Sequence, residues 1–275
     1  MSESMDDRTL LIVGGGRMGE ALLGGLLAAG RPAPELVVAE VSPSRREELA
    51  AAHPGVAVFE AVVPAAAAVL AVKPGDVAGA ARAVADAGVP RVLSVAAGVT
   101  TRAIESAAGR RLAVVRAMPN TPALIGAGAA AISPGSAASE EDLEWAEDVL
   151  GAVGVVVRVA ETALDAVTGL SGSGPAYVFL VAEAMAEAGV LAGLSREVAE
   201  TLAFQTLLGS SRLLVDGSIG PAALRAAVTS PGGTTAAGLR ELERGGVRAA
   251  FLDAVTAAAA RSRELGQCPG PSDGR

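Results

Sequence analysis

A glycine-rich stretch near the start of the chain, GGGRMG at residues 14–19, has residue types suited to binding a dinucleotide. It matches the pattern G-x-G-x-x-G and lies between an apolar strand-like run and a helical pattern. Glycine is needed here because a side chain would block both the tight turn and the close approach of backbone N–H groups to a pyrophosphate. We therefore expect a dinucleotide cofactor to bind at this turn. The expected contacts are Gly14, Gly16, Arg17, Met18 and Gly19.

An acidic residue, Glu40, ends the second strand-like run, 21 residues after Gly19. A carboxylate at this place commonly binds the ribose hydroxyls of the adenosine and favours NAD. The serines and arginines that follow could instead bind the 2′-phosphate of NADP, because they donate hydrogen bonds to phosphate. They are Ser42, Ser44, Arg45 and Arg46. A solvated helix face is the other interpretation of the two arginines, so the choice between NADH and NADPH stays open.

Two short turns after later strand-like runs, AVKP at 71–74 and AAG at 96–98, are further candidates for cofactor contacts. In an open α/β sheet the ligand lies outside the carboxyl ends of the strands, where these turns are expected. Small residues are also common in ordinary turns, and Lys73 could face either cofactor or solvent. The expected contacts are Ala71, Val72, Lys73, Pro74, Ala97 and Gly98.

A second polar stretch, TSPGGTT at residues 229–235, interrupts a region of alanine-rich helical patterns. It is either a linker or a site. A helix cap would explain Thr229 or Ser230 alone, but it does not explain Pro-Gly-Gly followed by two threonines. We therefore interpret the stretch as a site.

The elements that position these residues follow from the hydrophobic pattern of the first part of the chain. Strand-like runs are expected at 9–13, 36–40, 56–59, 69–72, 91–95, 112–117, 126–133 and 153–159. Helical patterns lie between most of them, with Ser44 and Ser139 as candidate helix caps. This alternation predicts an α/β fold, a Rossmann-type, doubly wound parallel sheet with right-handed crossovers, as the dinucleotide-binding domain over 9–160.

After about Glu161 the strand-like runs largely disappear, and an all-α C-terminal domain is expected over 161–265. Its helices are predicted at 164–191, 195–215, 221–228, 234–244 and 247–265. This half is too apolar for the surface of a monomer, so we expect it to associate with another copy. The ends, 1–8 and 266–275, are expected to be disordered.

Composition limits the remaining classes of function. The net charge of −8 argues against nucleic-acid binding, and no apolar run approaches the length of a membrane span. The polar, acidic start is unlike a signal peptide, so a soluble, cytoplasmic protein is expected. With one cysteine, Cys268, and one histidine, His53, neither a disulfide framework nor the usual kind of zinc site is expected.

Four motifs together resemble those of pyrroline-5-carboxylate reductases. They are GGGRMGEALLGGL, VRAMPNTP at 115–122, DAVTGLSGSGPAYVF at 165–179 and VTSPGGTTAAGL at 228–239, in the family's order from about Thr9 to Leu265. The resemblance implies reduction of 1-pyrroline-5-carboxylate, a small imine, to L-proline with NADPH or NADH, the last step of proline biosynthesis. It also implies a helical dimerisation domain, a homodimer or a higher homo-oligomer built from dimers, and active sites at the dimer interface.

The resemblance also assigns residues to the site. The substrate contacts would be Ser230, Gly233, Thr234 and Thr235, with Thr235 as the catalytic hydroxyl that donates to the ring nitrogen. Glu161 would lie near the substrate, and Asn120 would face the nicotinamide. These assignments suit the chemistry, because free N–H groups at a helix start can bind the substrate carboxylate and a protonated imine needs no strong general acid.

Two departures from the family pattern concern the cofactor. Arg17 stands where the family often has asparagine, so it would either contact the pyrophosphate or point outward. Glu40 and Val41 replace an Asn-Arg pair, which puts a preference for NADP in doubt.

Three alternative functions remain beside this resemblance: reduction of another cyclic imine, a β-hydroxyacid dehydrogenase-like reaction and a non-catalytic NAD(P)-binding sensor. Hydroxyacid oxidation in that class uses a lysine after the Rossmann domain, whereas the one lysine, Lys73, lies within it. A sensor should lack the polar turn at 229–235, which is complete here.

Overall fold

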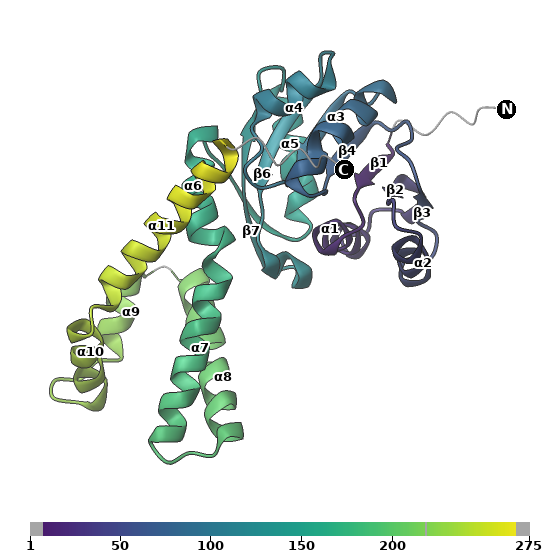
Figure 1. The fold of residues 1–275 in the computed structure, drawn as a ribbon. Coiled ribbons are helices and arrows are strands. Elements are labelled where there is room, and N and C mark those ends of the chain that lie inside the picture. Colours follow the sequence, from purple (N-terminus) through teal and green to yellow (C-terminus); the bar gives the residue numbers. More distant parts are fainter. Residues whose placement is uncertain (1–7, 218, 268–275) are drawn as a thin grey trace, which may run out of the picture. The chain divides into compact units, whose positions relative to one another are not determined.

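The computed structural model describes residues 8–217 and 219–267, and the chain divides into two compact units (Figure 1). The sheet unit comprises Met1–Ser173 and Thr256–Arg275, and the helical unit comprises Gly174–Val255. The first part of the predicted helical domain, 161–173, thus belongs to the sheet unit. The domain boundary expected at residue 160 differs from the limit of the compact sheet unit, and it stays a prediction about the functional domains.

The sheet unit is built on eight strands. They are β1 (Leu10–Val13), β2 (Leu36–Ala39), β3 (Ala57–Phe59), β4 (Ala67–Leu70), β5 (Arg91–Ser94), β6 (Ala113–Met118), β7 (Gly128–Pro134) and β8 (Gly154–Arg158). Their order is β3-β2-β1-β4-β5-β6-β7-β8, and the order reverses between β1 and β4 as in a Rossmann sheet. The α/β prediction is confirmed, with all eight strands found and their ends within two residues of expectation.

The expectation of an entirely parallel sheet was wrong at one edge. Strand β7 runs antiparallel to β6, with Met118 opposite Ala131, and β8 runs parallel to β7. Only a short 3-10 helix, η3 (Thr121–Ile125), connects β6 to β7, and a parallel crossover needs a dozen or more residues. The connection therefore forces β7 to return in the opposite direction.

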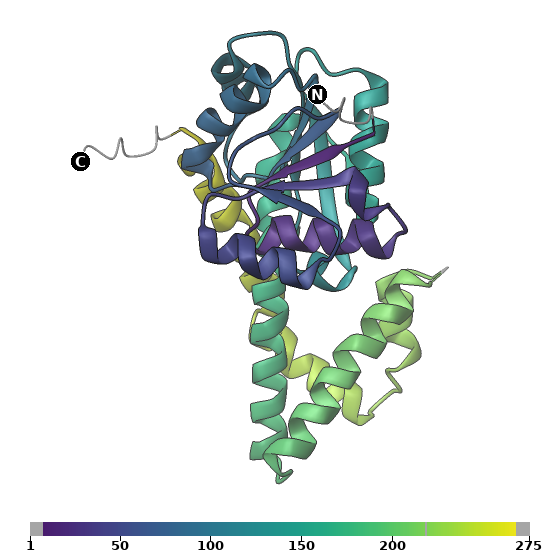
Figure 2. The ribbon, with the colours of Figure 1, turned by 90° about the vertical axis from the view of Figure 1, so that its right-hand side faces the viewer.

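Helices cover both faces of the sheet. Helices α1 (Arg17–Ala28), α2 (Pro43–Ala52) and α5 (Glu140–Gly151) pack on one face, and α3 (Val77–Asp86) and α4 (Thr101–Ala108) pack on the other. Figure 2 shows α1 and α2 together on one side. Successive side chains of a strand point to opposite faces, so Leu10 and Ile12 enter one core while Leu11 and Val13 enter the other. The glycine turn therefore follows a strand that is fixed from both sides.

The two predicted serine caps had different outcomes. Ser139 caps α5, since its hydroxyl accepts a hydrogen bond from the N–H of Asp142 and the Asp142 carboxylate accepts one from the N–H of Ser139. Ser44 was the wrong choice for α2, because the helix begins at Pro43 with Ser42 in the cap position. Proline suits the first helical position since its φ is preset and its missing N–H is not needed there.

The helix expected at 164–191 is interrupted. It consists of α6 (Leu164–Val167), a π-helical segment η5 (Thr168–Gly172) and α7 (Gly174–Leu191). In the π-helical segment, the carbonyl of Ser171 accepts a hydrogen bond of 3.0 Å from Nδ2 of Asn120. A Cβ at Gly172 would lie 2.6 Å from Cε of Met118. Close approach of β6 therefore accounts for the glycine-rich sequence of this segment.

The helical unit contains α7, α8 (Arg196–Val215), α9 (Pro221–Ala227), α10 (Thr234–Arg244) and the first part of α11 (Val247–Gln267). Helices α7 and α8 approach closely through small residues, since a Cβ at Gly189 would lie 3.0 Å from the Cβ of Ala199. Three shorter 3-10 helices complete the structure: η1 (Ala33–Glu35), η2 (Pro74–Asp76) and η4 (Glu161–Ala163).

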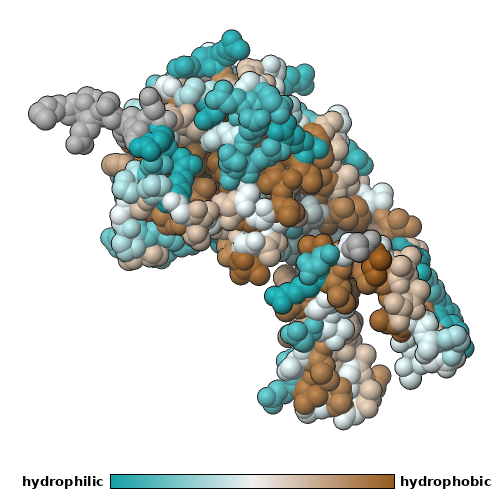
Figure 3. Space-filling view, turned by 180° about the vertical axis from the view of Figure 1, so that it is seen from behind, coloured by the Kyte–Doolittle hydropathy of each residue, from teal (hydrophilic) through white to brown (hydrophobic). Residues whose placement is uncertain are grey.

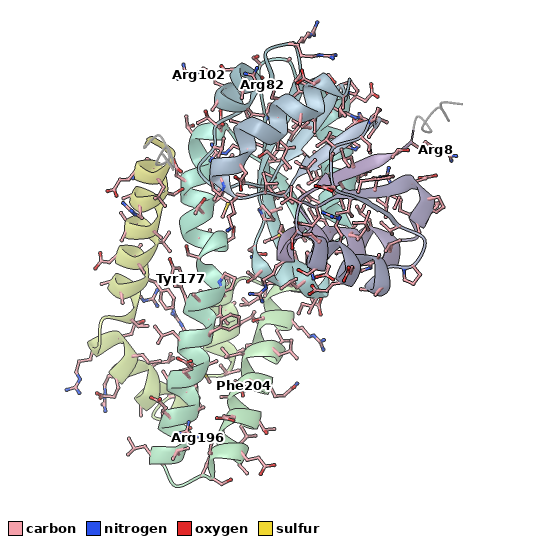
Figure 4. The ribbon with its side chains drawn as sticks, turned by 45° about the vertical axis from the view of Figure 1, so that its right-hand side comes forward. Arg8, Arg82, Arg102, Tyr177, Arg196 and Phe204 are labelled. Atoms are coloured by element: carbon pink, nitrogen blue, oxygen red, sulfur yellow. The ribbon has the colours of Figure 1, made fainter. Side chains whose placement is uncertain are left out.

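Large apolar side chains are exposed on the helical unit, as the hydropathy surface shows (Figure 3). Phe204 on α8 is 52% exposed, and Figure 4 shows it together with Tyr177 of α7. Others are Val178, Phe179, Leu180, Leu202, Leu208, Leu214 and Leu252. Within the described chain, Glu161–Leu191 is the one helical stretch long and apolar enough to cross a membrane by length and composition. Exposed apolar area of this kind also marks protein–protein contacts.

The last turns of α11 belong to the sheet unit. The hydroxyl of Ser262 donates a 2.6 Å hydrogen bond to the carboxylate of Asp165, and a Cβ at Gly266 would lie 2.9 Å from the carbonyl oxygen of Gly98. Helix α11 continues to Gln267, two residues beyond the expected end at Leu265. Residues 266 and 267, expected to be disordered, are therefore helical. The rest of that tail, 268–275, and residues 1–7 of the expected disordered start lie outside the described residues.

Candidate active site

The glycine turn connects β1 to α1 at the carboxyl edge of the sheet. Gly14 has a φ of 99°, and a Cβ there would lie 2.6 Å from the carbonyl oxygen of Ala71 at the end of β4. Gly16 is the N-cap of α1 without a side-chain cap, and a Cβ there would meet no atom within 4 Å. Gly16 therefore adjoins open space at the uncapped start of α1, which is where a pyrophosphate would bind.

The other residues of the turn divide into structural and exposed positions. A Cβ at Gly19 would collide with the carbonyl of Gly14, so glycine here keeps α1 close to the strand. Met18 is half-buried and packs against the core. Arg17, the first residue of α1, is exposed. Of these three predicted contacts, Arg17 has the freest access to a ligand at the helix start.

Glu40 lies beside the glycine turn, as its position after β2 predicts. Its Oε2 accepts a 2.8 Å hydrogen bond from the N–H of Gly15, and its Oε1 accepts one of 2.8 Å from the N–H of Ser42. The structure thus brings the predicted ribose-binding carboxylate and the predicted phosphate-binding turn together.

The arginines after Glu40 contact protein groups rather than forming a solvated face. The Nε of Arg45 donates a 2.8 Å hydrogen bond to the carbonyl of Gly15, and Arg45 pairs with Glu20 of α1. The hydrogen bond from Nη2 of Arg45 to the carboxylate of Glu20 lowers the pKa of Glu20, although burial raises it. Arg45 therefore fastens α2 to the glycine turn, a role that no local sequence signal shows.

The predicted turns after β4 and β5 lie near each other. The N–H of Ala71 donates to the carbonyl of Val13, so β4 ends beside the glycine turn, with Val72 and the exposed Lys73 following. A cavity of about 460 Å³ opens at this edge of the sheet. It is lined by Pro74, Gly75, Ala97, Gly98, Val99, Thr100, Ala103, Thr168, Ser262, Leu265 and Gly266. Three predicted contacts, Pro74, Ala97 and Gly98, thus border one cavity at the carboxyl ends of the strands, where an α/β sheet binds its ligand.

A larger cavity of about 950 Å³ lies at the opposite ends of the strands. Pro90 and Arg91 at the start of β5, and Ala113 at the start of β6, are among its lining residues. Since ligands of open α/β sheets bind outside the carboxyl ends, this cavity is not the cofactor site.

Asn120 holds two elements of the sheet unit together. Its Nδ2 donates to the carbonyl of Ser171, and its Oδ1 accepts a 2.9 Å hydrogen bond from the N–H of Ala129 in β7. Both polar ends of the amide are therefore occupied within the protein. Contact with the nicotinamide, which the family resemblance implies for Asn120, remains a prediction.

Glu161 is the centre of a partly buried polar cluster. Its Oε1 accepts from the N–H of Thr101 at 2.8 Å and from Nη1 of Arg116 at 3.1 Å, while its Oε2 accepts from the Thr101 hydroxyl at 2.9 Å. Burial raises the pKa of Glu161, but the hydrogen bonds from Thr101 and Arg116 outweigh it, and the pKa lies below its ordinary value. The cluster fixes the start of α4, three residues after Gly98.

The turn predicted to bind substrate lies in the helical unit between α9 and α10. The N–H of Gly233 donates to the carbonyl of Ser230 at 3.0 Å, Pro231 occupies the second position, and Gly232 has a φ of 68°. Proline followed by a glycine of positive φ is the signature of a type II turn. The hydroxyl of Thr229 donates to the carbonyl of Arg225 at 2.6 Å and so belongs to the end of α9.

The start of α10 has no side-chain cap. Gly233 is its N-cap without a side-chain cap, so no side chain of the cap residue uses the first N–H groups of the helix. Ser230 and Thr234 are exposed and Thr235 is half-buried, and their hydroxyls form no hydrogen bond within the described residues. Free N–H groups and hydroxyls at a helix start can bind a carboxylate and donate one further hydrogen bond.

Groups for strong acid–base or metal chemistry are few. His53, the one histidine of the sequence, lies at the end of α2. Its Nε2 is 3.4 Å from Oε1 of Glu20 in α1. No three His, Cys, Asp or Glu side chains gather into a metal-binding group among residues 8–217 and 219–267.

Comparisons with known proteins match both units. A family model described as pyrroline-5-carboxylate reductase dimerisation matches residues 161–265, and one described as NADP oxidoreductase coenzyme F420-dependent matches 9–98. Pyrroline-5-carboxylate reductase of Mycobacterium tuberculosis is 47% identical over 93% of this chain and 96% of its own. That of Synechocystis is 45% identical over 93% and 97%.

Solved structures agree. A pyrroline-5-carboxylate reductase from Coxiella burnetii has a TM-score of 0.90 at 35% identity, covering 96% of this chain and all of its own. The Plasmodium falciparum pyrroline carboxylate reductase with NADP bound has a TM-score of 0.82 at 28% identity, again covering 96% of this chain and all of its own. The similarity thus extends over both units.

Proposed function

Because the chain belongs to the pyrroline-5-carboxylate reductase family, we propose that it reduces 1-pyrroline-5-carboxylate to L-proline with NADPH or NADH, the last step of proline biosynthesis. The observation that carries the proposal is the uncapped start of α10, where the hydroxyls of Ser230, Thr234 and Thr235 form no hydrogen bond within the described residues. We expect a non-catalytic nucleotide-binding protein to lack this polar turn.

The sheet unit provides the cofactor site. Gly14 and Gly16 allow the pyrophosphate to reach the start of α1, and Glu40 accepts hydrogen bonds from the adenosine ribose. The turns at 71–74 and 97–98 border the nicotinamide end. When bound, the reduced nicotinamide supplies the hydride.

The turn before α10 provides the substrate site. The N–H groups at the start of α10 bind the substrate carboxylate, because the positive end of the helix favours an anion. The hydroxyl of Thr235 donates to the lone pair that forms on the ring nitrogen as the hydride adds. Hydride adds to the carbon of the C=N bond, the bonding pair moves to nitrogen, and a protonated imine already carries the proton that the product amine keeps. No strong general acid is required.

The family match to a dimerisation domain supports a homo-oligomer. We further propose that this oligomer is a homodimer or is built from dimers, and that the exposed apolar side chains of α7 and α8 lie in its interface. A soluble, cytoplasmic enzyme fits this arrangement, since a protein partner then covers the apolar helices. Light scattering that shows only monomer at working concentration would contradict the proposed homo-oligomer.

An absorbance assay at about 340 nm tests the proposed reaction, since it follows oxidation of the reduced nicotinamide. Purified protein with 1-pyrroline-5-carboxylate and either NADH or NADPH should consume the cofactor and form proline in equal amounts. Six-membered cyclic imines and β-hydroxy acids with the oxidised cofactors are the comparison substrates. Failure to oxidise either cofactor with 1-pyrroline-5-carboxylate would refute the proposal, and a faster reaction with a comparison substrate would favour that alternative.

A further inference from the structure

We infer that the dinucleotide site selects NADH, whose adenosine ribose carries no 2′-phosphate, and that Glu40 is the residue that determines this specificity. The inference deepens the proposed function and rests on it for the reaction. Cofactor binding can be measured without the substrate, so the two can fail separately.

The position of the Glu40 carboxylate is fixed by two backbone hydrogen bonds, from Gly15 and Ser42, each 2.8 Å long. A carboxylate oxygen has two lone pairs, so each oxygen can still accept a hydrogen bond from a ribose hydroxyl. A phosphate at the same place offers no such donor and carries a charge of about −1.5 to −2 near neutral pH. The fixed carboxylate therefore attracts the hydroxyl and repels the phosphate.

Arg45, the first candidate for a phosphate-binding arginine, is committed to other partners. Its Nε donates to the carbonyl of Gly15, its Nη1 donates to Glu48 at 2.8 Å, and its Nη2 pairs with Glu20. All three nitrogens of the guanidinium thus have an acceptor. A phosphate that reached the remaining N–H groups of Arg45 would lie beside the carboxylates of Glu20 and Glu48, which repel it.

Arg46, the second candidate, contacts protein groups through two of its three nitrogens. Its Nη1 donates to the backbone carbonyls of Glu40 and Val41, each at 2.9 Å, and its Nη2 lies 3.7 Å from the carboxylate of Glu60. Tight recognition of a phosphate by arginine uses two parallel N–H groups of one guanidinium. The pair that remains in Arg46, Nε and Nη2, includes the nitrogen that lies 3.7 Å from Glu60, so a phosphate bound there would compete with that carboxylate.

Titration of the full-length protein with NADH and with NADPH, followed by the fluorescence of the bound dinucleotide, tests the inference. We expect NADH to bind at least about tenfold more tightly than NADPH. Glu40→Gln keeps the length of the side chain and removes its charge, so it should reduce this ratio by about tenfold. Equal or tighter binding of NADPH by the unaltered protein, or an unchanged ratio in Glu40→Gln, would overturn the inference.

Two further variants separate charge from folding. Glu47→Gln makes the same change of charge on the exposed face of α2 and should leave both dissociation constants within about twofold. Glu40→Asp keeps the charge and should keep the preference for NADH, even if Glu40→Gln disturbs the turn. A Glu40→Asp protein that prefers NADPH would contradict the inference.

Assays of the reaction separate the specificity assigned to Glu40 from the proposed function. If 1-pyrroline-5-carboxylate is reduced with a higher kcat/KM for NADPH than for NADH, the inference fails and the proposed function stands. If the protein binds NADH preferentially but reduces no 1-pyrroline-5-carboxylate, the proposed function fails and the specificity assigned to Glu40 stands.

Discussion

Oε1 of Glu161 lies 3.1 Å from Nη1 of Arg116, an arginine of β6 that is only 6% exposed. Removing one partner of such a pair leaves the other charge buried without compensation. We expect Glu161→Gln to lower the free energy of unfolding by roughly 2–4 kcal/mol, somewhat less than for a fully buried pair because the carboxylate keeps contact with water. Urea unfolding of both proteins at neutral pH measures this difference.

The matched control is Glu144→Gln, an exposed acid of α5 with no hydrogen bond in the described structure. It should change the free energy of unfolding by less than about 0.5 kcal/mol. The family resemblance places Glu161 near the substrate, and the same variant tests that role. A Glu161→Gln protein of unaltered stability but raised KM would show a substrate contact instead of the structural role argued from Thr101 and Arg116.

The lowered pKa of Glu161 makes its contribution depend on pH. A carboxyl whose pKa is lower in the folded than in the unfolded protein stabilises fully above the unfolded value, and that stabilisation is lost as the pH falls through the folded value. The difference between the unaltered protein and Glu161→Gln should therefore be greatest near neutral pH and shrink below about pH 4.5. Unfolding curves at several pH values check this, and a difference that grows on acidification would contradict the assigned direction.

Gly14 and Gly16 should respond differently to alanine. In Gly14→Ala the new Cβ meets the carbonyl of Ala71 at a φ of 99°, so we expect a loss of roughly 2–3 kcal/mol in the free energy of unfolding. Gly16→Ala meets no atom within 4 Å and should cost less than about 1 kcal/mol. Its Cβ would nevertheless occupy the open space before α1, and we expect NADH to bind at least about tenfold more weakly.

Unfolding experiments and cofactor titrations of both glycine variants test these two predictions. A Gly16→Ala protein that binds NADH normally would show that the pyrophosphate does not approach this side of the turn. A Gly14→Ala protein as stable as the unaltered one would contradict the constraint imposed by the end of β4.

The fold could be predicted largely because parallel strands buried on both faces have continuous apolar sequences. Strand β1, at Leu10–Val13, is such a run, and all four residues are buried. The direction of β7 was missed although the sequence carries a signal for it, since only eight residues, 118–125, separate the two expected strands and a parallel crossover needs a dozen or more. The π-helical segment was also missed, since it forms where Asn120, 51 residues away in sequence, contacts Ser171.

The candidate site could be predicted where the signal is a local spacing. Gly14, Gly16 and Glu40 follow from the ends of two strands. By contrast, Arg45 contacts the carbonyl of Gly15 across 30 residues, and Thr101 contacts Glu161 across 60. Such pairs depend on tertiary packing, so composition and periodicity carry no trace of them.

Thr235 should be the most sensitive hydroxyl for catalysis. If it donates to the ring nitrogen, Thr235→Ala should lower kcat by about 10- to 100-fold while cofactor affinity stays within about twofold. Thr235→Ser keeps a hydroxyl and should recover most of the rate. Thr229→Ala makes the same change six residues earlier, where the hydroxyl is bonded to the carbonyl of Arg225, and should keep kcat nearly unchanged. Steady-state kinetics of the three variants, together with NADH binding, measure these effects. An unchanged kcat in Thr235→Ala would contradict the role assigned to Thr235.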